Sequence, residues 1–289
     1  MNTSGDGTRP TLAWVEGTVA RPELKRLWEL MDEHVRDLAG SDYDVTFAVL
    51  PMQSGGVRSA APSLANSVLG LSAAREAAVI GKADLVVFNG WTMPVRVTRA
   101  LLDVSVTGVD EGSVFMGCVL SQRPAVVTVS KGFRWELESL LEEFGLRSRM
   151  ATPPVWWLDP ESTHDDVVRA VDDPDELVSR VDSVAQRAVA AGADAILLGC
   201  GYFGAVLARA GYTHVNGRPD VPVYDCTRLA LEFGSTLYRL RKAGIGPSRL
   251  GFAQPSPASL AALEGMLTHL TETRGEGTGG VRNALVHTG

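Results

Sequence analysis

The sequence contains few cysteines for its length, only Cys118, Cys200 and Cys226 among 289 residues. The number is odd, and the spacing does not fit a disulfide framework, which requires pairs of cysteines at short intervals. The scarcity of cysteine therefore excludes a disulfide-stabilised scaffold and suits a reducing compartment. We expect a cytoplasmic location.

Positive charge is also scarce in this chain. It has 27 Lys and Arg residues against 34 Asp and Glu, for a formal net charge of −7 and a pI near 5.3. Proteins that bind nucleic acids usually carry a cluster of basic residues that neutralises phosphates, and the sequence has no such cluster. We therefore expect a small-molecule ligand and no nucleic-acid partner.

Two other patterns are missing. No apolar run is long enough to span a bilayer, and the N-terminus, MNTSGDGTRP, lacks the charged start and apolar stretch of a signal peptide, so no membrane partner is expected. The histidines show no pair at metal-ligand spacing on a common helix, so we expect no metal site. They are His34, His164, His214, His269 and His287.

Short β-branched segments alternate with longer segments of helical periodicity along most of the chain. This alternation is typical of parallel strands joined by crossover helices. Strands are expected at 11–17, 44–51, 83–90, 103–108, 124–130, within 148–159, at 193–200 and at 221–225, and covering helices at 22–40, 63–82, 132–145, 165–192 and 228–244. The pattern predicts an α/β protein with two groups of four strands.

Two of the predicted strands end in related patterns, KADLVVFNGW and GADAILLGCG. In each, an aspartate opens the apolar run, but the first copy has Gly90 where the second has Cys200. Ligands of parallel α/β sheets bind beyond the carboxyl ends of the strands, so both positions are candidates for a site. The amides of a helix starting near Phe203 would lower the pKa of the Cys200 thiol and suit it to proton transfer. The alternative is a buried apolar thiol. Cys226, at the start of a later helix, is a second candidate for a low-pKa thiol.

The segment GCGYFG, residues 199–204, also matches the glycine pattern of a dinucleotide-binding turn, and Asp225 follows at roughly the required distance of about twenty residues. That fingerprint normally opens a long series of βαβ units. Here most of the predicted strands precede it. We therefore do not expect a dinucleotide cofactor.

Several segments, taken in order, resemble the Asp/Glu/hydantoin racemase superfamily, and hydantoin racemases in particular. They are DVSVTGVDEGSVFMG, PAVVTVS, GADAILLGC, VPVYD and GIGPSRLGFAQP, within a match that extends from Thr11 to Pro255. The resemblance implies two similar Rossmann-like, or flavodoxin-like, subdomains with four-stranded parallel sheets, a pseudo-twofold axis and an active site in the cleft between them. The first subdomain would comprise 11–107 with 226–255, and the second 108–225. Residues 1–10 and 271–289 are expected to be flexible tails.

Racemases of this superfamily use one cysteine from each half, on opposite faces of the substrate, and no metal or coenzyme. Carried over to this sequence, Cys200 is the second cysteine, but Gly90 stands at the first position and cannot transfer a proton. Arylmalonate decarboxylases of the superfamily have the same glycine and cysteine. Loss of carbon dioxide generates the carbanion without a base, so a single acid suffices. The resemblance therefore favours a decarboxylase of a small carboxylic acid or cyclic imide.

Three alternatives stay open. They are a one-base isomerase or tautomerase, a hydantoin or amino-acid racemase with a substitute base, and an inactive ligand-binding homologue. The first two, like the decarboxylase, create negative charge on an oxygen that must be met by hydrogen-bond donors. Candidate donors at the predicted strand ends are Thr18, Thr92, Thr128, Ser130, Gly201 and Tyr202, and candidate pocket residues or second bases are Glu16, Trp91, Glu111, Lys131 and Asp225.

Each of these residues also has a purely structural interpretation. Serines and threonines at strand ends often cap helices, Lys131 is a solvated residue on that view, and Trp91 packs between the subdomains. Substrate specificity is assigned to the segments 51–63 and 91–100. A homo-oligomer is left open.

Overall fold

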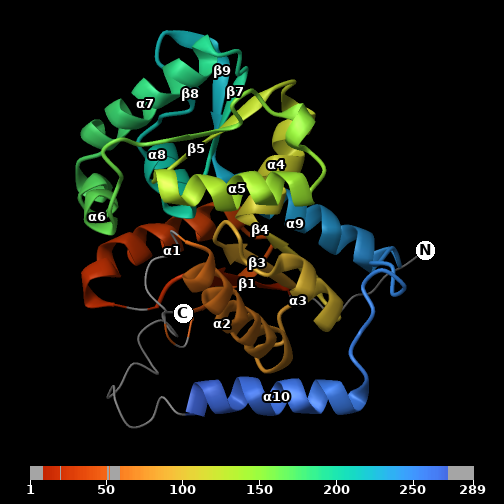
Figure 1. Cartoon of the computed structure of the whole chain (residues 1–289). Helices are drawn as coiled ribbons and strands as arrows, with labels where there is room; N and C mark the ends of the chain where they lie inside the picture. The colour runs from red at the N-terminus through yellow and green to blue at the C-terminus, as the bar shows by residue number, and fades with distance from the viewer. Residues whose placement is uncertain (1–8, 20, 51, 53–58, 273–289) are drawn as a thin grey trace.

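The computed structural model describes residues 9–19, 21–50, 52 and 59–272, and it contains two β-sheets, each covered by helices (Figure 1). The predicted flexible tails lie outside the described residues, except for residues 9, 10, 271 and 272. Residues 271 and 272 belong to a helix. In the predicted specificity segment 51–63, residues 51 and 53–58 also lie outside the described part.

The first sheet is parallel and has the strand order β2-β1-β3-β4. Its elements are β1 (Thr11–Glu16), α1 (Lys25–Ala39), β2 (Asp44–Ala48), α2 (Ala60–Val79), β3 (Leu85–Asn89), α3 (Val95–Leu101) and β4 (Ser105–Gly108). Every residue of β3 is buried, which explains its continuous apolar sequence, since parallel strands are covered on both faces.

The second sheet has the order β6-β5-β7-β9-β8. Its elements are β5 (Pro124–Thr128), α5 (Lys131–Glu143), β6 (Val155–Trp157), α6 (His164–Asp172), α7 (Asp175–Ala190), β7 (Ala195–Leu198), α8 (Gly201–Arg209), β8 (His214–Val215) and β9 (Arg218–Tyr224), and α4 (Val109–Leu120) precedes β5. The predicted α/β fold with parallel sheets is confirmed.

The strand count of the second sheet differs from the prediction, because this sheet has five strands. The additional strand, β8, is two residues long and pairs antiparallel with β9. Asn216 and Gly217 connect the two strands, and Gly217 has a φ of +71°. An Asn-Gly pair between two strands favours a tight hairpin turn because both residues tolerate positive φ.

The helix prediction is wrong at one segment and lacks two helices of the structure. The segment 165–192 forms two helices, α6 and α7, because the chain turns at Asp173 before Pro174. Proline lacks an amide donor and disfavours a helical conformation in the residue before it. The short helix α3 and the C-terminal helix α10 (Pro257–Glu272) were not predicted from the sequence.

The helix α9 (Cys226–Lys242) follows β9 in the chain but packs against α4, β3 and β4 (Figure 1). Because α4 also contacts both β3 and β7, the two halves share these helices. The division into 11–107 with 226–255 and 108–225 stays a prediction, as does the pseudo-twofold relation.

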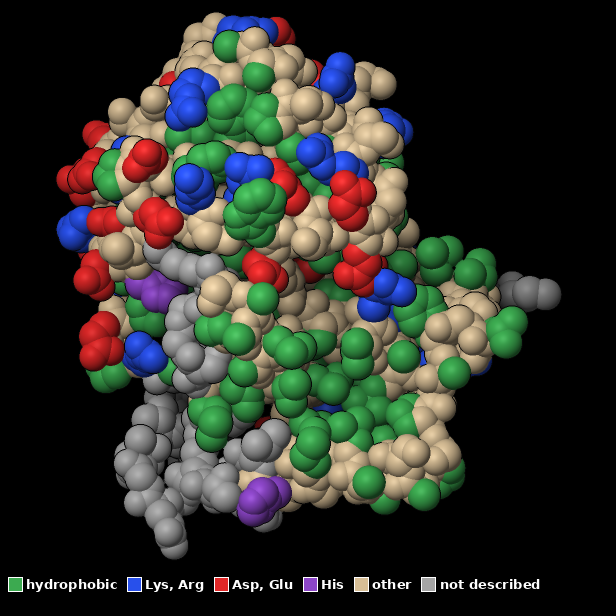
Figure 2. All heavy atoms as spheres, in the orientation of Figure 1, with side chains coloured by type: hydrophobic (Ala, Val, Ile, Leu, Met, Phe, Trp, Pro, Cys, Tyr) green, Lys and Arg blue, Asp and Glu red, His purple; other side chains and the backbone are tan. Residues whose placement is uncertain are grey.

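At the far end of the molecule, α10 lies beside the first sheet's helices, and Arg75 of α2 forms an ion pair with its Glu264. Hydrophobic side chains gather in the region of α3 and α10, whereas basic and acidic side chains are interspersed over the other half of this face (Figure 2). Within the described residues, no helix is both long and apolar enough to cross a membrane.

The strand β1 connects two hydrophobic cores, because alternate side chains of a strand point to opposite faces. Ala13 and Val15 belong to a core made by the first half. Leu12 and Trp14 belong to a larger core that includes residues of both sheets. Glu16 is two residues after Trp14 and therefore points to the same face of β1, so its carboxyl is directed toward the second half.

Candidate active site

A cavity of about 200 Å³ lies between the carboxyl ends of the two sheets. Both halves contribute to its wall, as the sequence predicted for the cleft. The lining residues are Gly17, Thr18, Ser63, Asn66, Asn89, Gly90, Trp91, Thr92, Met93, Val129, Phe133, Ser162, Thr163, His164, Val167, Gly199, Cys200, Gly201 and Tyr202. The predicted residues Cys200, Gly90, Thr18, Trp91, Thr92, Gly201 and Tyr202 are thus brought together.

Cys200 follows β7 after a single glycine and occupies the N-cap position of α8. Its backbone is extended there, with φ of −158° and ψ of 127°. The helix begins at Gly201, two residues earlier than expected. Cys200 is half-buried and lines the cavity together with Gly201 and Tyr202. The first amides of a helix have no partner within the helix and form its positive end. The thiol therefore lies where negative charge is stabilised.

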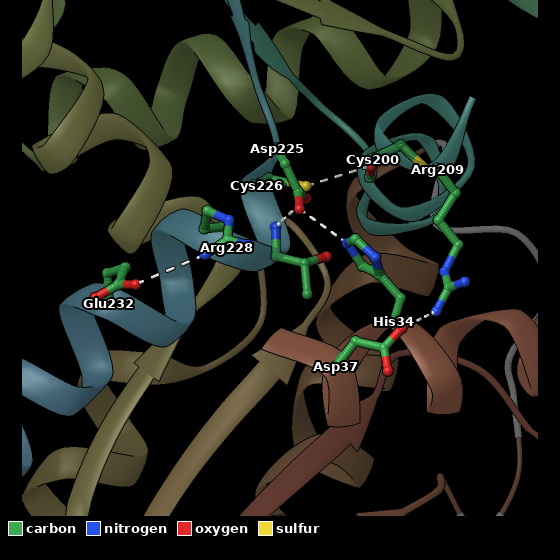
Figure 3. Close-up of polar contacts among 9 residues, drawn as sticks. His34, Asp37, Cys200, Arg209, Asp225, Cys226, Arg228 and Glu232 are labelled. Atoms are coloured by element: carbon green, nitrogen blue, oxygen red, sulfur yellow. Dashed lines mark hydrogen bonds and ion pairs between the residues drawn. The ribbon is translucent and has the colours of Figure 1, made fainter. Parts of the chain in front are cut away.

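Behind Cys200, a buried group of polar contacts joins α1 to the start of α9 (Figure 3). The Asp225 carboxylate contacts His34 Nε2 at 2.8 Å and accepts from the backbone N–H of Thr227 at 2.9 Å. Cys226 Sγ donates to the carbonyl oxygen of Cys200 at 3.5 Å. These contacts fix the backbone that carries the thiol. Cys226 itself is inaccessible, and burial raises the pKa of its thiol well above the ordinary value, which contradicts its prediction as a low-pKa thiol.

Gly90 directly follows β3 in the other half, but it does not leave an empty space. A Cβ atom at this position would lie 2.8 Å from Cγ of Met93, a contact too close for real side chains. The Met93 side chain therefore occupies the space into which a side chain at position 90 would extend. Gly90 also lies close to Gly17, because β1 and β3 are neighbours with Glu16 opposite Asn89.

Thr92 lines the cavity with its backbone in the left-handed region, at φ +74°, which few non-glycine residues adopt. Its hydroxyl is 2.9 Å from that of Ser63 in α2, and its backbone N–H donates to the buried carboxyl of Asp110. Burial raises the pKa of Asp110 from 3.8 to about 7. Asp110 thus supports the strained residue from behind.

Glu16 lies beneath the cavity wall, and only 1% of its surface is exposed. Its carboxyl accepts hydrogen bonds from Trp14 Nε1 at 2.8 Å, from Asn89 Nδ2 at 2.9 and 3.0 Å, and from the Tyr202 hydroxyl at 3.0 Å. The Tyr202 hydroxyl is also 2.8 Å from that of Thr18. Burial raises the pKa of Glu16 from 4.5 to about 7, although its partners partly oppose the shift.

The remaining predicted residues do not line the cavity. The Thr128 hydroxyl donates to the carbonyl of Gly199, and Ser130 caps α5 by accepting from Phe133. Lys131 is exposed. Glu111 forms a largely buried ion pair with Arg99, and Asp225 lies behind Cys200. Apart from Lys131, the side chains of these residues hold strands and helices together, and none of the five lines the cavity.

Several cavity residues were not predicted from the sequence. Asn89 immediately precedes Gly90 at the end of a buried strand, so the strand-end argument that selected Gly90 applied to it equally. Ser63 in α2 and Met93 after Thr92 fall at the end of the segment 51–63 and within the segment 91–100, to which specificity was assigned, but neither was singled out as an individual residue. His164 begins α6, an exposed position whose ring contacts that of Tyr202 at 6.3 Å between centroids.

Gly201 is essential to the contact between the halves. A Cβ atom there would lie 1.7 Å from Oδ1 of Asn89, whose amide is fixed by two hydrogen bonds to Glu16. We expect Gly201→Ala to lower the free energy of unfolding by at least about 2 kcal/mol, since overpacking displaces a held side chain. Urea denaturation measures the change. Gly246→Ala, where nothing lies within 4 Å, is the control, and equal effects of the two substitutions would contradict this account.

Residues 26–234 match the model of a family described as Asp/Glu/Hydantoin racemase, and this match covers more than half of the chain. The chain therefore belongs to the Asp/Glu/hydantoin racemase family, as its motifs predicted. A hydantoin racemase of Pseudomonas sp. (strain NS671) is 30% identical over 164 residues, which are 55% of this chain. The match spans 60% of that relative's length.

Two allantoin racemases of known structure share the fold. The enzyme from Klebsiella pneumoniae superposes with a TM-score of 0.67 at 20% identity, covering 86% of this chain and 94% of the other. The enzyme from Pseudomonas fluorescens gives a TM-score of 0.67 at 19% identity, covering 86% of this chain and 97% of the other. At these identities the likeness concerns the arrangement of the strands and helices.

Proposed function

We propose that the protein is a racemase-type isomerase that moves a proton at a carbon next to a carbonyl group in a small cyclic imide, with Cys200 as the proton carrier on one face. The observation that carries this proposal is the position of Cys200, which lines the cavity between the sheets at the first turn of α8. Membership of the racemase family supports the same reaction type.

The chemistry follows from that position. A thiolate at Cys200 removes the proton from the acidic carbon, and the electrons move onto the neighbouring carbonyl oxygen as an enolate. The backbone amides of Gly201 and Tyr202, at the positive end of α8, are donors for this oxygen. The Thr92 hydroxyl is a further donor. Return of a proton to the opposite face completes the inversion.

The charge of the cavity wall supports a ring without a free carboxylate as the substrate. No lysine or arginine is present among the lining residues in the described ranges. A malonate or an amino acid would bring one or two carboxylates into this wall without a lysine or arginine to pair with them, and unpaired charge is costly away from water. A hydantoin is uncharged and offers carbonyl and N–H groups to Ser63, Asn66 and Thr92. The hydantoin racemase relative supports the same class.

Decarboxylation is the second candidate function, and Gly90 is the observation that favours it. A decarboxylase needs a proton donor on one face only, and Cys200 meets that requirement. The relatives are named as racemases, however, and among the described residues the lining has no lysine or arginine for a carboxylate. We therefore rank this reaction below proton exchange with inversion.

The test is an isotope experiment in deuterated water with single enantiomers of 5-benzylhydantoin, 5-isobutylhydantoin and allantoin, and with phenylmalonate and aspartate. Proton NMR follows exchange, chiral chromatography follows inversion, and carbon dioxide release is measured in parallel. Exchange and inversion of a hydantoin support the proposal. Carbon dioxide release from phenylmalonate alone replaces it with the decarboxylase. Measurable binding of a hydantoin without exchange would indicate a binding protein.

Restoring a thiol at position 90 is expected to increase inversion only if space is made for it. In Gly90→Cys the new side chain meets Met93, whereas in the double variant with Met93→Ala that space is free. We expect the double variant to invert the preferred hydantoin about tenfold faster than Met93→Ala alone. Chiral chromatography measures the rates. Equal rates in two folded proteins would show that position 90 does not face the substrate.

A further inference from the structure

Three hydroxyl and carboxyl groups form a continuous hydrogen-bonded chain from the buried interior to the cavity. Glu16 Oε2 is 3.0 Å from the Tyr202 hydroxyl, which is 2.8 Å from the Thr18 hydroxyl. Thr18 and Tyr202 line the cavity, whereas Glu16 does not. This series of hydrogen bonds therefore connects an acidic group that the substrate cannot touch with a hydroxyl on the cavity wall.

The series of hydrogen bonds reaches the cavity from the side of Gly90. Thr18 follows β1, which pairs with β3 such that Glu16 is opposite Asn89, the residue before Gly90. Cys200 follows β7 of the other sheet. A proton delivered at Thr18 and one delivered at Cys200 therefore come from different halves of the molecule.

We propose that Glu16 stores the second proton of the reaction and exchanges it with the substrate through the hydroxyls of Tyr202 and Thr18, on the face opposite Cys200. This inference rests on the proposed function, since it supplies the proton path that an inversion needs and that Gly90 lacks.

The transfer balances without any further reactant. When the carbanion accepts the hydroxyl proton of Thr18, Thr18 takes the proton of Tyr202, and Tyr202 takes that of the Glu16 carboxyl, which is left as a carboxylate. In the reverse direction each hydroxyl passes its proton inward, and Glu16 ends protonated. The hydroxyls of Thr18 and Tyr202 each make one O–H bond and break one, so they stay neutral. Among the protein groups only Glu16 has a net gain or loss of a proton, and only its charge changes.

The groups around the carboxyl suit this exchange. Those that face it are the indole of Trp14 on β1, the amide of Asn89 on β3 and the hydroxyl of Tyr202 on α8, none of them charged. With a pKa of about 7, Glu16 gives and accepts a proton at similar cost near neutral pH. Burial and the nearby Glu16 raise the pKa of Tyr202 well above its ordinary value, so this hydroxyl passes protons on without ionising.

The test compares Glu16→Gln, Thr18→Val and Tyr202→Phe with wild type on the hydantoin enantiomer whose proton faces Cys200. Cys200 can remove and return deuterium on its own face, so exchange with retention should continue. Inversion should fall by about 10²-fold, because it needs the second proton path. Thr18→Ser keeps the hydroxyl and should restore inversion.

The matched control is Tyr212→Phe, which removes another buried tyrosine-to-carboxylate hydrogen bond, that of Tyr212 to Asp182 at 2.8 Å, away from the cavity. It should change neither rate. For the opposite enantiomer, wild-type inversion should rise with pH through about 7, as Glu16 ionises, and Glu16→Gln should lose this dependence. The relay would be overturned if Glu16→Gln, Thr18→Val and Tyr202→Phe left the ratio of inversion to exchange unchanged for the Cys200-facing enantiomer. An equal fall of both rates is one such outcome.

A measurement on the protein without substrate separates the relay from the reaction. Infrared difference spectra between pH 5 and 9 should contain a carboxyl band that titrates near neutral pH, disappears in Glu16→Gln, shifts in Tyr202→Phe and persists in Asp110→Asn. Wild type that inverts hydantoins but lacks this band refutes the relay and leaves the proposed function standing. Wild type that shows the band but exchanges no hydantoin refutes the proposed function, and with it the relay's role.

Discussion

Replacing Cys200 with alanine is expected to lower the rate of deuterium exchange into the enantiomer that faces it by about 10²–10⁴-fold, the range typical for loss of a positioned acid or base. The thiol lies at the N-terminus of α8 and lines the cavity, and the helix amides that face it remain in the variant. The free energy of unfolding should change by about 1 kcal/mol or less, because the side chain is only half-buried.

Two other thiols provide the controls. Cys118→Ala removes a buried thiol from α4, where its Sγ lies 3.9 Å from Sδ of Met150, and it should leave exchange unchanged. Cys226→Ala removes the donor to the carbonyl of Cys200, so a small loss is expected there. If Cys200→Ala retained full exchange, or Cys226→Ala lost as much as Cys200→Ala, the assignment of the proton carrier would be wrong. Proton NMR measures the exchange rates, and urea denaturation of the same variants shows whether a lost rate reflects a loss of stability.

The stability of the protein is expected to fall as the pH rises from 5 to 8, unlike that of most proteins rich in paired carboxylates. Glu16 and Asp110 have pKa values of about 7 in the folded state, against 4.5 and 3.8 for the free groups. Between these values the folded protein holds protons that the unfolded chain releases. The folded state is therefore favoured at low pH, and this advantage is lost as the pH rises through the window.

The size of this effect is on the order of 3 kcal/mol for each carboxyl, from a shift of two to three pKa units. Below about pH 4 the opposite trend takes over, since Arg241 holds the pKa of Asp103 below its usual range and the Thr163 backbone N–H does so for Asp166. We therefore expect maximal stability near pH 4. Urea denaturation at a series of pH values measures the slope.

Glu16→Gln and Asp110→Asn should each flatten that slope by removing one buried titrating group. The matched control is Glu23→Gln, at an exposed carboxyl, which should leave the slope unchanged. A wild-type slope of zero between pH 5 and 8 would mean that neither buried carboxyl holds its proton above pH 5 in the folded protein. A slope that persisted in both variants would assign the titration to other groups.

Much of the fold followed from the sequence because the central strands β3, β5 and β7 are buried throughout and their apolar runs have clear ends. The ends of β3 and β7 could therefore be located from the apolar pattern alone, and with them the positions of Gly90 and Cys200. Two breaks in the secondary structure were missed because only one or two residues mark each of them. Pro174 divides α6 from α7, and Asn216 with Gly217 turns the chain into β9.

The contacts between the halves could not be derived in the same way. Glu16 and Tyr202 are 186 residues apart, and their hydrogen bond depends on how the two sheets pack. The same is true of Asn89 against Gly201. Sequence order indicated that Glu16 ends a strand, but it did not indicate which buried groups surround it. Met93 fills the space at Gly90 through a loop conformation that no periodic pattern encodes.

Tyr202 belongs to the half that carries Cys200, but its two hydrogen-bond partners, Thr18 and Glu16, belong to the half that carries Gly90. A rotation of one sheet away from the other would lengthen both bonds at the same moment. An open molecule would then keep its thiol but lose its route for the second proton. Separation of the halves would thus stop inversion and leave only the exchange that Cys200 can carry out on its own face.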